Sequence, residues 1–283
     1  MARPPKFSLL DYLEKNAPVV CDGSKPLLLQ NLGFPETEAS FIANITHPEL
    51  VSQTYKQYLQ SGAAILRTNT EGAHRLVLES LGLIDRGENI NNNGMALLRE
   101  GAGIAGIPAG SITSVHKDVS GKIPNHLLEK SYGEQLIYQS DTGVLFFMLS
   151  EFTDFEDLKL AARVAKRSTP KQVVAHLRFQ NDDPRDFLGK LAEVQQISDF
   201  IGIQASWQEA HLTELVQSSV DQFGIVSLLL DEPAPLHFGE ISSAFTETLS
   251  KLLPLEPAMI GGGRGTTPAH IRSIADGVNK LFA

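Results

Sequence analysis

The segment Gly261-Gly262-Gly263-Arg264-Gly265 has the residue types of an anion-binding loop. Glycine lets a backbone approach a ligand closely, and Arg264 carries a permanent, forked cation. The two threonines and the proline that follow are expected to begin a helix, whose free N–H groups favour an anion. We therefore predict an anion site in which Gly262, Gly263 and Arg264 contact the ligand. The alternative is a tight glycine-rich turn with a solvent-exposed arginine.

Polar residues also follow short apolar runs elsewhere in the chain. Thr68 and Asn69 follow one run, where their hydroxyl and amide groups could hold a polar substrate or satisfy a turn. Glu151 and Asp154 follow another and could form a carboxylate pair that binds an amino group. Asp154 could instead cap the next helix. His176, at the end of a third run, is more typical of a hydrogen-bonded structural residue than of a base or ligand.

Short apolar runs alternate with longer amphipathic segments, which is the pattern of repeated β-α units. The runs recur every 35 residues or so, roughly the length of a strand, a helix and two loops. No Gly-x-Gly-x-x-Gly motif follows the first run, which disfavours a dinucleotide-binding open sheet. We expect an α/β fold, a single (β/α)8 TIM barrel over residues 1–283, with the candidate residues at the C-terminal ends of its strands. The predicted strands are Pro18–Asp22, Ala63–Thr68, Gly103–Ile107, Val144–Leu149, Gln172–Leu177, Phe200–Ile203, Ile225–Leu230 and Ala258–Ile260.

Capping signals predict the helices between these strands. Proline in a first turn and glycine after a last turn delimit Pro48–Ser61, which Gly62 would end. Asp154 would cap Phe155–Arg167, whose small and apolar residues fall on one face. The last helix is expected to begin at Pro268.

Composition excludes several classes of function. The chain has 283 residues and a net charge of −9, which disfavours nonspecific binding to nucleic acid or to an anionic membrane. Cys21 is the single cysteine, so no intrachain disulfide can form. No apolar run has the length of a signal peptide or a membrane span. We expect a cytoplasmic protein without a nucleic-acid or membrane partner.

Three motifs occur in order along nearly the whole chain: Asp22-Gly23, Thr68-Asn69-Thr70-x-Gly72-Ala73 and Gly261-Gly262-x-x-Gly265-Thr266-Thr267-Pro268-x-His270-Ile271. Together they resemble the homocysteine S-methyltransferase family. This family includes betaine–homocysteine methyltransferase and the homocysteine domain of cobalamin-dependent methionine synthase. The resemblance implies a (β/α)8 barrel and a small amino-acid or one-carbon substrate.

Members of that family bind zinc through three cysteines, and the zinc holds the homocysteine thiolate for methyl attack. Here the matching positions are Ala205, Gly263 and Arg264. A guanidinium repels Zn²⁺ but attracts a thiolate, carboxylate or phosphate. The resemblance therefore implies a changed ligand site, and we predict no metal and no cofactor.

Two more arginines stand where the family more usually has apolar or hydroxyl residues. They are Arg67 and Arg178, at the ends of the second and fifth predicted strands. If they converge with Arg264, the barrel mouth is cationic although the protein is acidic.

Three functions remain open at this point. The first is a zinc-independent methyl or one-carbon transferase for a small anionic or amino-acid substrate, with Arg264 and Glu151 as catalytic residues. A corrinoid or folate methyl-donor protein is the partner that the resemblance implies. The second is an anion-binding lyase or isomerase that uses Glu151, Asp154 or His176 as acid or base. The third is a noncatalytic barrel that binds a metabolite or a partner. The expected substrate-binding residues are Asp22, Thr68, Asn69, Arg67, Asp154, Arg178, Gly262 and Gly263.

Overall fold

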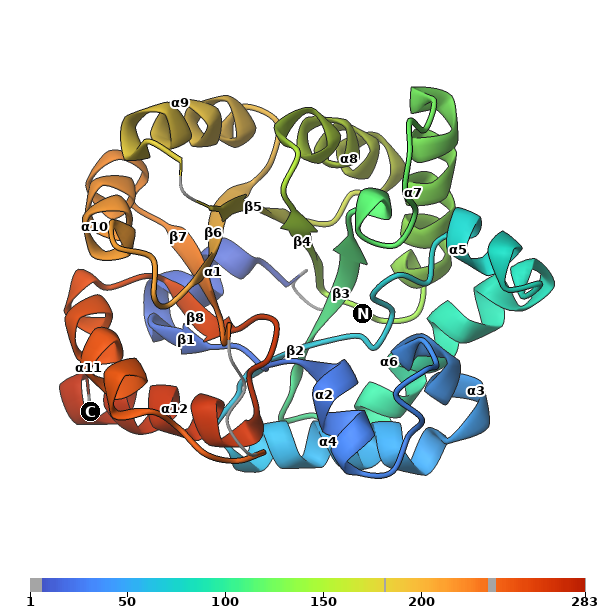
Figure 1. Cartoon of the computed structure of the whole chain (residues 1–283), viewed down its shortest axis with the longest axis horizontal. Coiled ribbons are helices and arrows are strands. Elements are labelled where there is room, and N and C mark those ends of the chain that lie inside the picture. Colours follow the sequence, from blue (N-terminus) through green and yellow to red (C-terminus); the bar gives the residue numbers. More distant parts are fainter. Residues whose placement is uncertain (1–6, 181, 234–237, 283) are drawn as a thin grey trace, which may run out of the picture.

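Eight parallel strands form the wall of a barrel surrounded by helices, so the predicted (β/α)8 fold is confirmed (Figure 1). The computed structural model describes residues 7–180, 182–233 and 238–282. Neighbouring strands pair in chain order, β8 pairs with β1, and a bridge between Cys21 and Ile65 joins β1 to β2. The strands are β1 (Val19–Val20), β2 (Ile65–Arg67), β3 (Ile107–Thr113), β4 (Phe146–Phe152), β5 (Val173–Phe179), β6 (Phe200–Ser206), β7 (Val226–Asp231) and β8 (Met259–Gly262).

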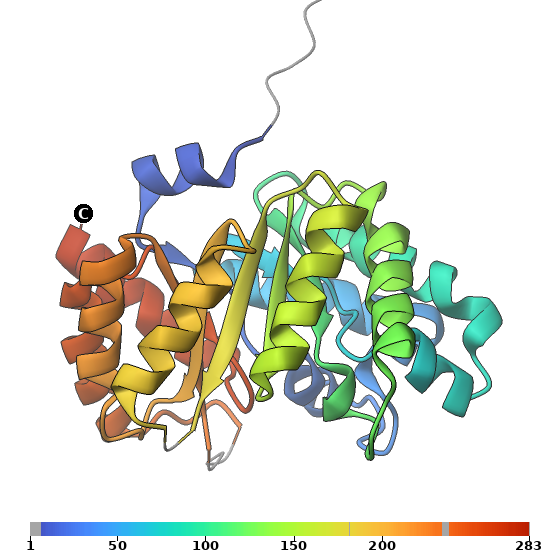
Figure 2. The same cartoon turned by 90° about the horizontal axis from the view of Figure 1, so that it is seen from above.

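The helices lie outside this wall, apart from α1, which crosses its N-terminal end (Figure 2). Leu9 and Leu13 of α1 are buried against the side chains that fill the N-terminal part of the barrel interior. The helices are α1 (Leu9–Asn16), α2 (Lys25–Asn31), α3 (Ala43–Thr46), α4 (Pro48–Gln60), α5 (Arg75–Ser80), α6 (Gly87–Ala102), α7 (Asn125–Ser140), α8 (Phe155–Ser168), α9 (Pro184–Gln195), α10 (Leu212–Phe223), α11 (Ser243–Leu252) and α12 (Pro268–Phe282).

Strand alternation produces two apolar layers. Residues such as Phe146, Met148 and Phe200 point into the barrel and meet α1. Their neighbours along the same strands, such as Phe147 and Ile201, pack against the helices in a second and larger cluster. Apolar side chains therefore fill the N-terminal part of the barrel interior. The polar C-terminal ends of the strands lie together at the other end, which we call the mouth. No helix in the described part of the chain is both long and apolar enough to cross a membrane.

The third predicted strand was wrong. The apolar letters of Gly103–Ile107 predicted a strand there, but β3 covers Ile107–Thr113. Gly103 instead ends α6 with a φ of +60°, and the Ile104 side chain lies wholly in solvent. Residues 108–111, which lie beyond the predicted strand, are part of the observed one. The other predicted strands overlap the observed ones, and the predicted helices Pro48–Ser61 and Phe155–Arg167 differ from α4 and α8 only at the final residue.

His176 lies inside the barrel wall and not in the mouth. Its Nδ1 contacts the carbonyl of Leu149 at 3.0 Å, and its Nε2 lies 2.8 Å from the hydroxyl of Ser227. A carbonyl only accepts, so Nδ1 donates to it and Nε2 accepts from Ser227. Burial lowers the pKa of His176 to about 3, so the ring stays neutral. This geometry fits the structural role and not the alternative role as an acid or base.

Gly202 makes room for the imidazole ring of His176. We therefore expect Gly202→Ala to destabilise the barrel. A Cβ atom at this position would lie 2.5 Å from Nε2 of His176, and overpacking of this kind costs about 1–3 kcal/mol. Urea unfolding would measure the loss.

Gly189→Ala is the matched control. Gly189 lies within α9 with open space around it, so alanine should stabilise the protein by up to about 1 kcal/mol. Equal stability of the two variants would contradict the packing of His176 against Gly202.

Candidate active site

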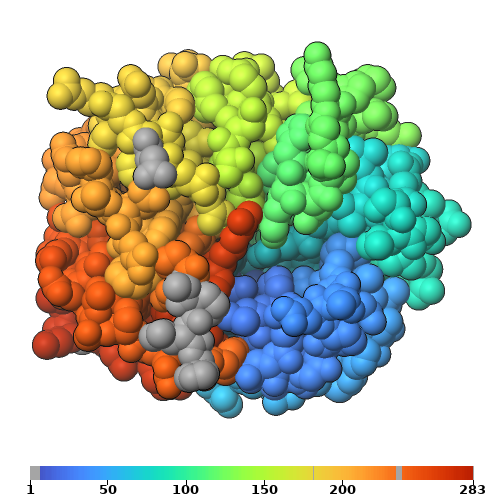
Figure 3. All heavy atoms as spheres, in the orientation of Figure 1, coloured from blue at the N-terminus to red at the C-terminus, as the bar shows by residue number. Residues whose placement is uncertain are grey.

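The C-terminal ends of the strands open onto the face seen in Figure 3, which is hollowed near its centre. Charged side chains meet there from strands that are distant in the sequence. They form two groups, one around Glu151 and Asp231 and the other around Asp22. Each group is largely buried, so its charges must be paired within the protein.

The first group joins β4, β5, β6 and β7. Arg178 donates to Glu151 Oε2 at 2.9 Å and also to Asp231 Oδ2. Gln204 donates to Glu151 Oε1 and, at 3.0 Å, to Asp231 Oδ1, while its own oxygen accepts from the backbone N–H of Glu151 at 2.8 Å. Burial raises the pKa of Asp231, Arg178 opposes this rise and Glu151 adds to it. One guanidinium and one amide therefore hold two carboxylates side by side.

Arg264 completes this group from the loop after β8. Its backbone N–H donates to Asp231 Oδ1 at 2.7 Å, and its Nε donates to Glu151 Oε2. The Arg264 side chain is 51% exposed, whereas that of Glu151 is 5% exposed. The guanidinium thus covers the carboxylate pair and presents its outer edge to solvent.

Local backbone geometry makes these contacts possible. Glu151 has a φ of +66°, a conformation that is unusual for a residue other than glycine, at the irregularity in the pairing of β4 with β5. Gly263 lies against the first group, and a Cβ atom there would overlap Asp231 Oδ1 and lie 3.0 Å from Gln204 Nε2. Strained backbone of this kind is typical of functional sites.

The second group lies where β1, β2 and β8 meet. Asp22 is completely buried and accepts from the backbone N–H of Arg67 at 2.9 Å and from its Nε at 2.7 Å. Arg67 also donates to the carbonyl of Gly262 at 2.7 Å. Lys25 Nζ lies 2.7 Å from the other side of the same carboxylate, at Oδ2. This group therefore ties the first strand to the glycine loop.

Thr68 and Asn69 are buried beside the second group but hydrogen-bond to the protein. Thr68 Oγ1 accepts from the backbone N–H of Ser111 at 2.9 Å. Asn69 donates to the carbonyl of Ser40 at 2.8 Å and to Asn44 at 3.0 Å. These contacts hold the loop after β2, and a role of the two residues in substrate binding stays a prediction.

Asp154 is exposed and caps α8, where its carboxylate accepts from the backbone N–H of Asp157 at 2.8 Å. The structure thus shows the helix-capping alternative and gives no contact between Asp154 and Glu151.

The three arginines lie as predicted at the mouth, but the mouth is not simply cationic. Arg178 and Arg264 both contact Glu151, while Arg67 lies on the other side of the glycine loop with Asp22. The expectation of unbalanced positive charge was wrong for the first group, because two carboxylates neutralise its two guanidinium groups.

Sequence analysis did not single out Lys25, Gln204 or Asp231 as site residues. Asp231 ends β7 and Gln204 lies two residues before the end of β6, and these positions near strand ends were the available signal. Nothing in the sequence indicated that both would contact Glu151.

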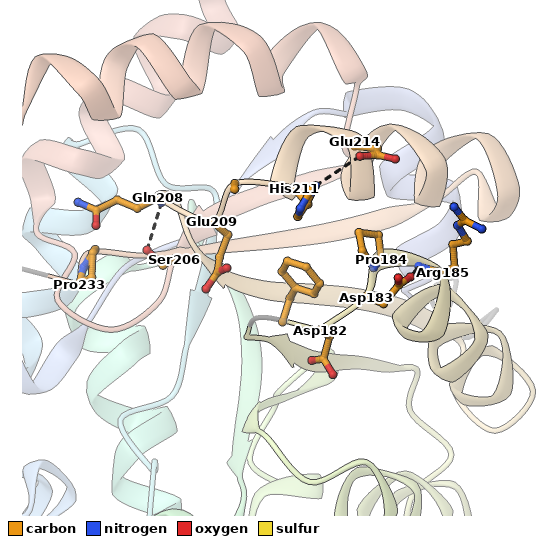
Figure 4. A pocket seen from close by; sticks show the side chains of 12 residues that line it. Asp182, Asp183, Pro184, Arg185, Ser206, Gln208, Glu209, His211, Glu214 and Pro233 are labelled. Atoms are coloured by element: carbon orange, nitrogen blue, oxygen red, sulfur yellow. Dashed lines mark hydrogen bonds and ion pairs between the residues drawn. The ribbon is translucent and has the colours of Figure 1, made fainter.

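A groove of about 880 Å³ lies beside the first group, over the loops that follow β5 and β6 (Figure 4). Asp182, Asp183, Glu209 and Glu214 line it, and His211 faces Glu214 at 3.6 Å. Ser206, at the end of β6, connects the groove to the strand that carries Gln204.

The homocysteine S-methyltransferase family model matches residues 19–278. The chain belongs to this family. It is 25% identical to S-methylmethionine–homocysteine S-methyltransferase of Pongo abelii, over 96% of this chain and 81% of that protein. It is 24% identical to the methionine synthase of Mycobacterium tuberculosis, over 85% of this chain but only 22% of that protein.

Solved structures agree on the fold. The metallated homocysteine methyltransferase MmuM from Escherichia coli superimposes with a TM-score of 0.77 at 16% identity, over 95% of this chain and 99% of that one.

The residues at the family's zinc positions do not fit a zinc ion. Gly263 and Ala205 offer no donor, and Arg264 is a cation. Ala205 also belongs to the apolar layer between the strands and the helices. Within residues 7–180, 182–233 and 238–282, no three His, Cys, Asp or Glu side chains are grouped to hold a metal. Independence from zinc stays a prediction that these side chains support.

We expect Arg178→Met to lower the free energy of unfolding by about 3–5 kcal/mol near neutral pH, because two buried carboxylates lose their shared partner. The deficit should shrink as the pH falls. Without Arg178 the folded-state pKa of Asp231 rises further, so protonation stabilises the variant at low pH and this gain is lost as the pH rises. Urea unfolding over a pH series measures both effects.

The control is Arg167→Met. Arg167 pairs with Glu129 on the surface, and its loss should cost less than about 1 kcal/mol. A deficit for Arg178→Met that is small, or that grows as the pH falls, would contradict the pairing described here.

Proposed function

We propose that this protein is a zinc-independent methyl or one-carbon transferase that acts on a small anionic or amino-acid substrate. Membership of the family supports methyl transfer, and two of the relatives are named as homocysteine S-methyltransferases. The proposal that the reaction needs no zinc rests on Arg264, at a position that the resemblance matches to a zinc ligand. Its guanidinium pairs with Glu151 and is half exposed. A fixed positive charge thus lies where relatives with cysteines hold a metal ion.

The chemistry requires a nucleophile that attacks the methyl carbon while the bond from that carbon to the donor breaks. A free thiol has a pKa near ~8.5 and is mostly protonated at neutral pH. A guanidinium beside the sulfur favours the thiolate by direct charge attraction. Arg264 supplies this group, and Glu151 with Asp231 fixes its orientation from below. The thiol proton leaves to solvent through the open mouth.

The source of the methyl group is a separate part of the proposal. The matched segment is 22% of the methionine synthase relative. A corrinoid or folate methyl-donor protein would bind at the open face of the barrel. Small methylated donors, such as those named for the other relatives, would need no partner.

The test is methyl transfer by chelator-treated protein, with mass spectrometry to detect the methylated product. The acceptors are homocysteine and simple thiol acids, and the donors are S-methylmethionine, betaine, a methylcorrinoid and methyltetrahydrofolate. We expect product without added zinc, and a rate about 100-fold lower for Arg264→Ala, which is the usual effect of removing one electrostatic stabiliser. Arg264→Lys should retain part of the rate because it keeps the charge but loses the fork.

Arg167→Ala is the control, since Arg167 lies on α8 in a surface pair with Glu129. It should leave the rate unchanged. Product that appears only after zinc is added, or equal rates for Arg264→Ala and the native protein, would overturn the proposal.

A further inference from the structure

A buried lysine lies at the barrel mouth and has hydrogen-bonding capacity to spare. Lys25 is the first residue of α2, the helix that follows β1, and its side chain is 1% exposed. Its Nζ forms an ion pair with Asp22 Oδ2 at 2.7 Å, and no further acceptor among the described residues takes up its other protons. Buried ammonium groups normally fill their donors within the protein. Lys25 is thus an anion-seeking group without a full set of acceptors.

The carboxylate beside it is already shared. Asp22 holds the backbone N–H and the Nε of Arg67 as well as the ammonium of Lys25. This group of three therefore carries two positive charges against one negative charge. Burial acts to lower the pKa of Lys25, and Arg67 adds to this, whereas Asp22 opposes it. A further anion would relieve the imbalance.

Glu71 is another carboxylate whose charge acts on Lys25, and it already forms an ion pair within the chain. Its carboxylate pairs with Lys117 at 3.7 Å and is 13% exposed. Burial acts to raise the pKa of Glu71, but Lys117, Arg67, Lys25 and Arg264 lower it further than burial raises it. The cations around Glu71 thus favour its charged form, and an anionic ligand beside them would be favoured in the same way.

The carboxylates that lie against Lys25 and Arg264 are engaged with cations of the chain itself. Glu151 holds Arg178 and Arg264, and Asp22 holds Lys25 and Arg67. An amino-acid substrate would have to displace one of these cations to pair its ammonium group. Displacing a partner from a buried ion pair leaves an uncompensated charge, which is strongly unfavourable.

We infer that the site selects a small oxyanion, above all a carboxylate, that carries no free ammonium group, and that Lys25 is the anchor of this anion. Lys25 keeps its ion pair with Asp22 and binds the ligand through the remaining N–H donors of its ammonium group. Arg264, from the other side of the glycine loop, faces the reacting end. This inference rests on the proposed function for the location of the site and narrows its substrate class.

Calorimetric titration of the native full chain with three matched thiols tests the selection. The ligands are homocysteine, 4-mercaptobutanoate (homocysteine without the amino group) and 3-mercaptopropylamine (homocysteine without the carboxylate). We expect 4-mercaptobutanoate to bind about tenfold or more tightly than homocysteine, because the carboxylates beside Lys25 and Arg264 are already paired with cations of the chain. The amine should not bind. Binding of homocysteine as tight as that of 4-mercaptobutanoate, or measurable binding of the amine, would overturn the inference.

Inorganic phosphate and butanoate separate the two possible sources of the oxyanion. Butanoate is expected to compete with 4-mercaptobutanoate, and phosphate to compete more weakly. No competition by either would contradict recognition of the anion.

Binding in these titrations needs no methyl donor, so the two proposals can fail separately. Selective binding of 4-mercaptobutanoate without methyl transfer would leave the inference standing and the proposed function wrong. Methylation of homocysteine, with homocysteine as the tighter ligand, would support the proposed function and overturn the inference about the substrate class.

Lys25→Gln assigns the anchor. It should weaken 4-mercaptobutanoate binding about tenfold or more, as expected for loss of a charge-assisted contact. Lys117→Gln is the matched control at the same mouth and should have little effect. Asp22 keeps Arg67 as its partner in this variant, and if Lys25→Gln still does not fold, the labelling of the native protein described next tests the same role.

Amine-reactive labelling of the native protein provides a readout without substitution. Mass spectrometry should show that 4-mercaptobutanoate slows acylation of Lys25, while exposed Lys166 reacts at an unchanged rate. Equal labelling of Lys25 with and without the ligand would overturn its role as anchor.

Discussion

The closed set of ion pairs around Glu151 and Asp231 is the constraint on which the rest of the mouth depends. Two carboxylates are buried side by side, and their charges are tolerable only because Arg178, Gln204 and the loop of Arg264 meet them. These partners come from β5, β6 and the loop after β8, so the network fixes how the strand ends lie relative to one another. It also orients the guanidinium of Arg264, which remains half exposed. A transferase site built on this guanidinium therefore depends on the unexposed charges beneath it.

Much of the architecture could be predicted from the sequence, because apolar runs and capping residues are local signals. The helix Phe155–Arg167 was placed to within a residue, since Asp154 caps it as its position indicated. The error at β3 shows where local signals fail. Gly103–Ile107 has the apolar letters of a strand, whereas the true strand holds small and hydroxyl residues that fit only inside a closed barrel. Closure is a property of all eight strands, so no single segment reveals it.

The site could be predicted as a set of strand ends but not as a set of contacts. Arg178 and Arg264 were expected at the mouth, and both are there. Their pairing with Glu151 depends on strands far apart in the sequence and on the positive φ of that glutamate. Lys25 illustrates the same limit, because only its burial beside a carboxylate already held by Arg67 makes it chemically distinctive. Residue type and spacing predict which groups are available, whereas the fold decides which of them remain unpaired.

The changes from the family's zinc pattern depend on one another physically. A side chain at position 263 would overlap Asp231, so a cysteine could return there only if that carboxylate moved. Asp231 could not move alone, because Arg178 and the backbone of Arg264 are bound to it. Replacing Arg264 by cysteine would in turn leave Glu151 with one cation fewer in a buried setting. The metal ligands and the ion pairs are therefore alternative solutions to the same problem, which is how to hold charge at the centre of this mouth. Single substitutions would therefore not convert these ion pairs into a set of zinc ligands, and this supports our proposal that the site serves a different ligand.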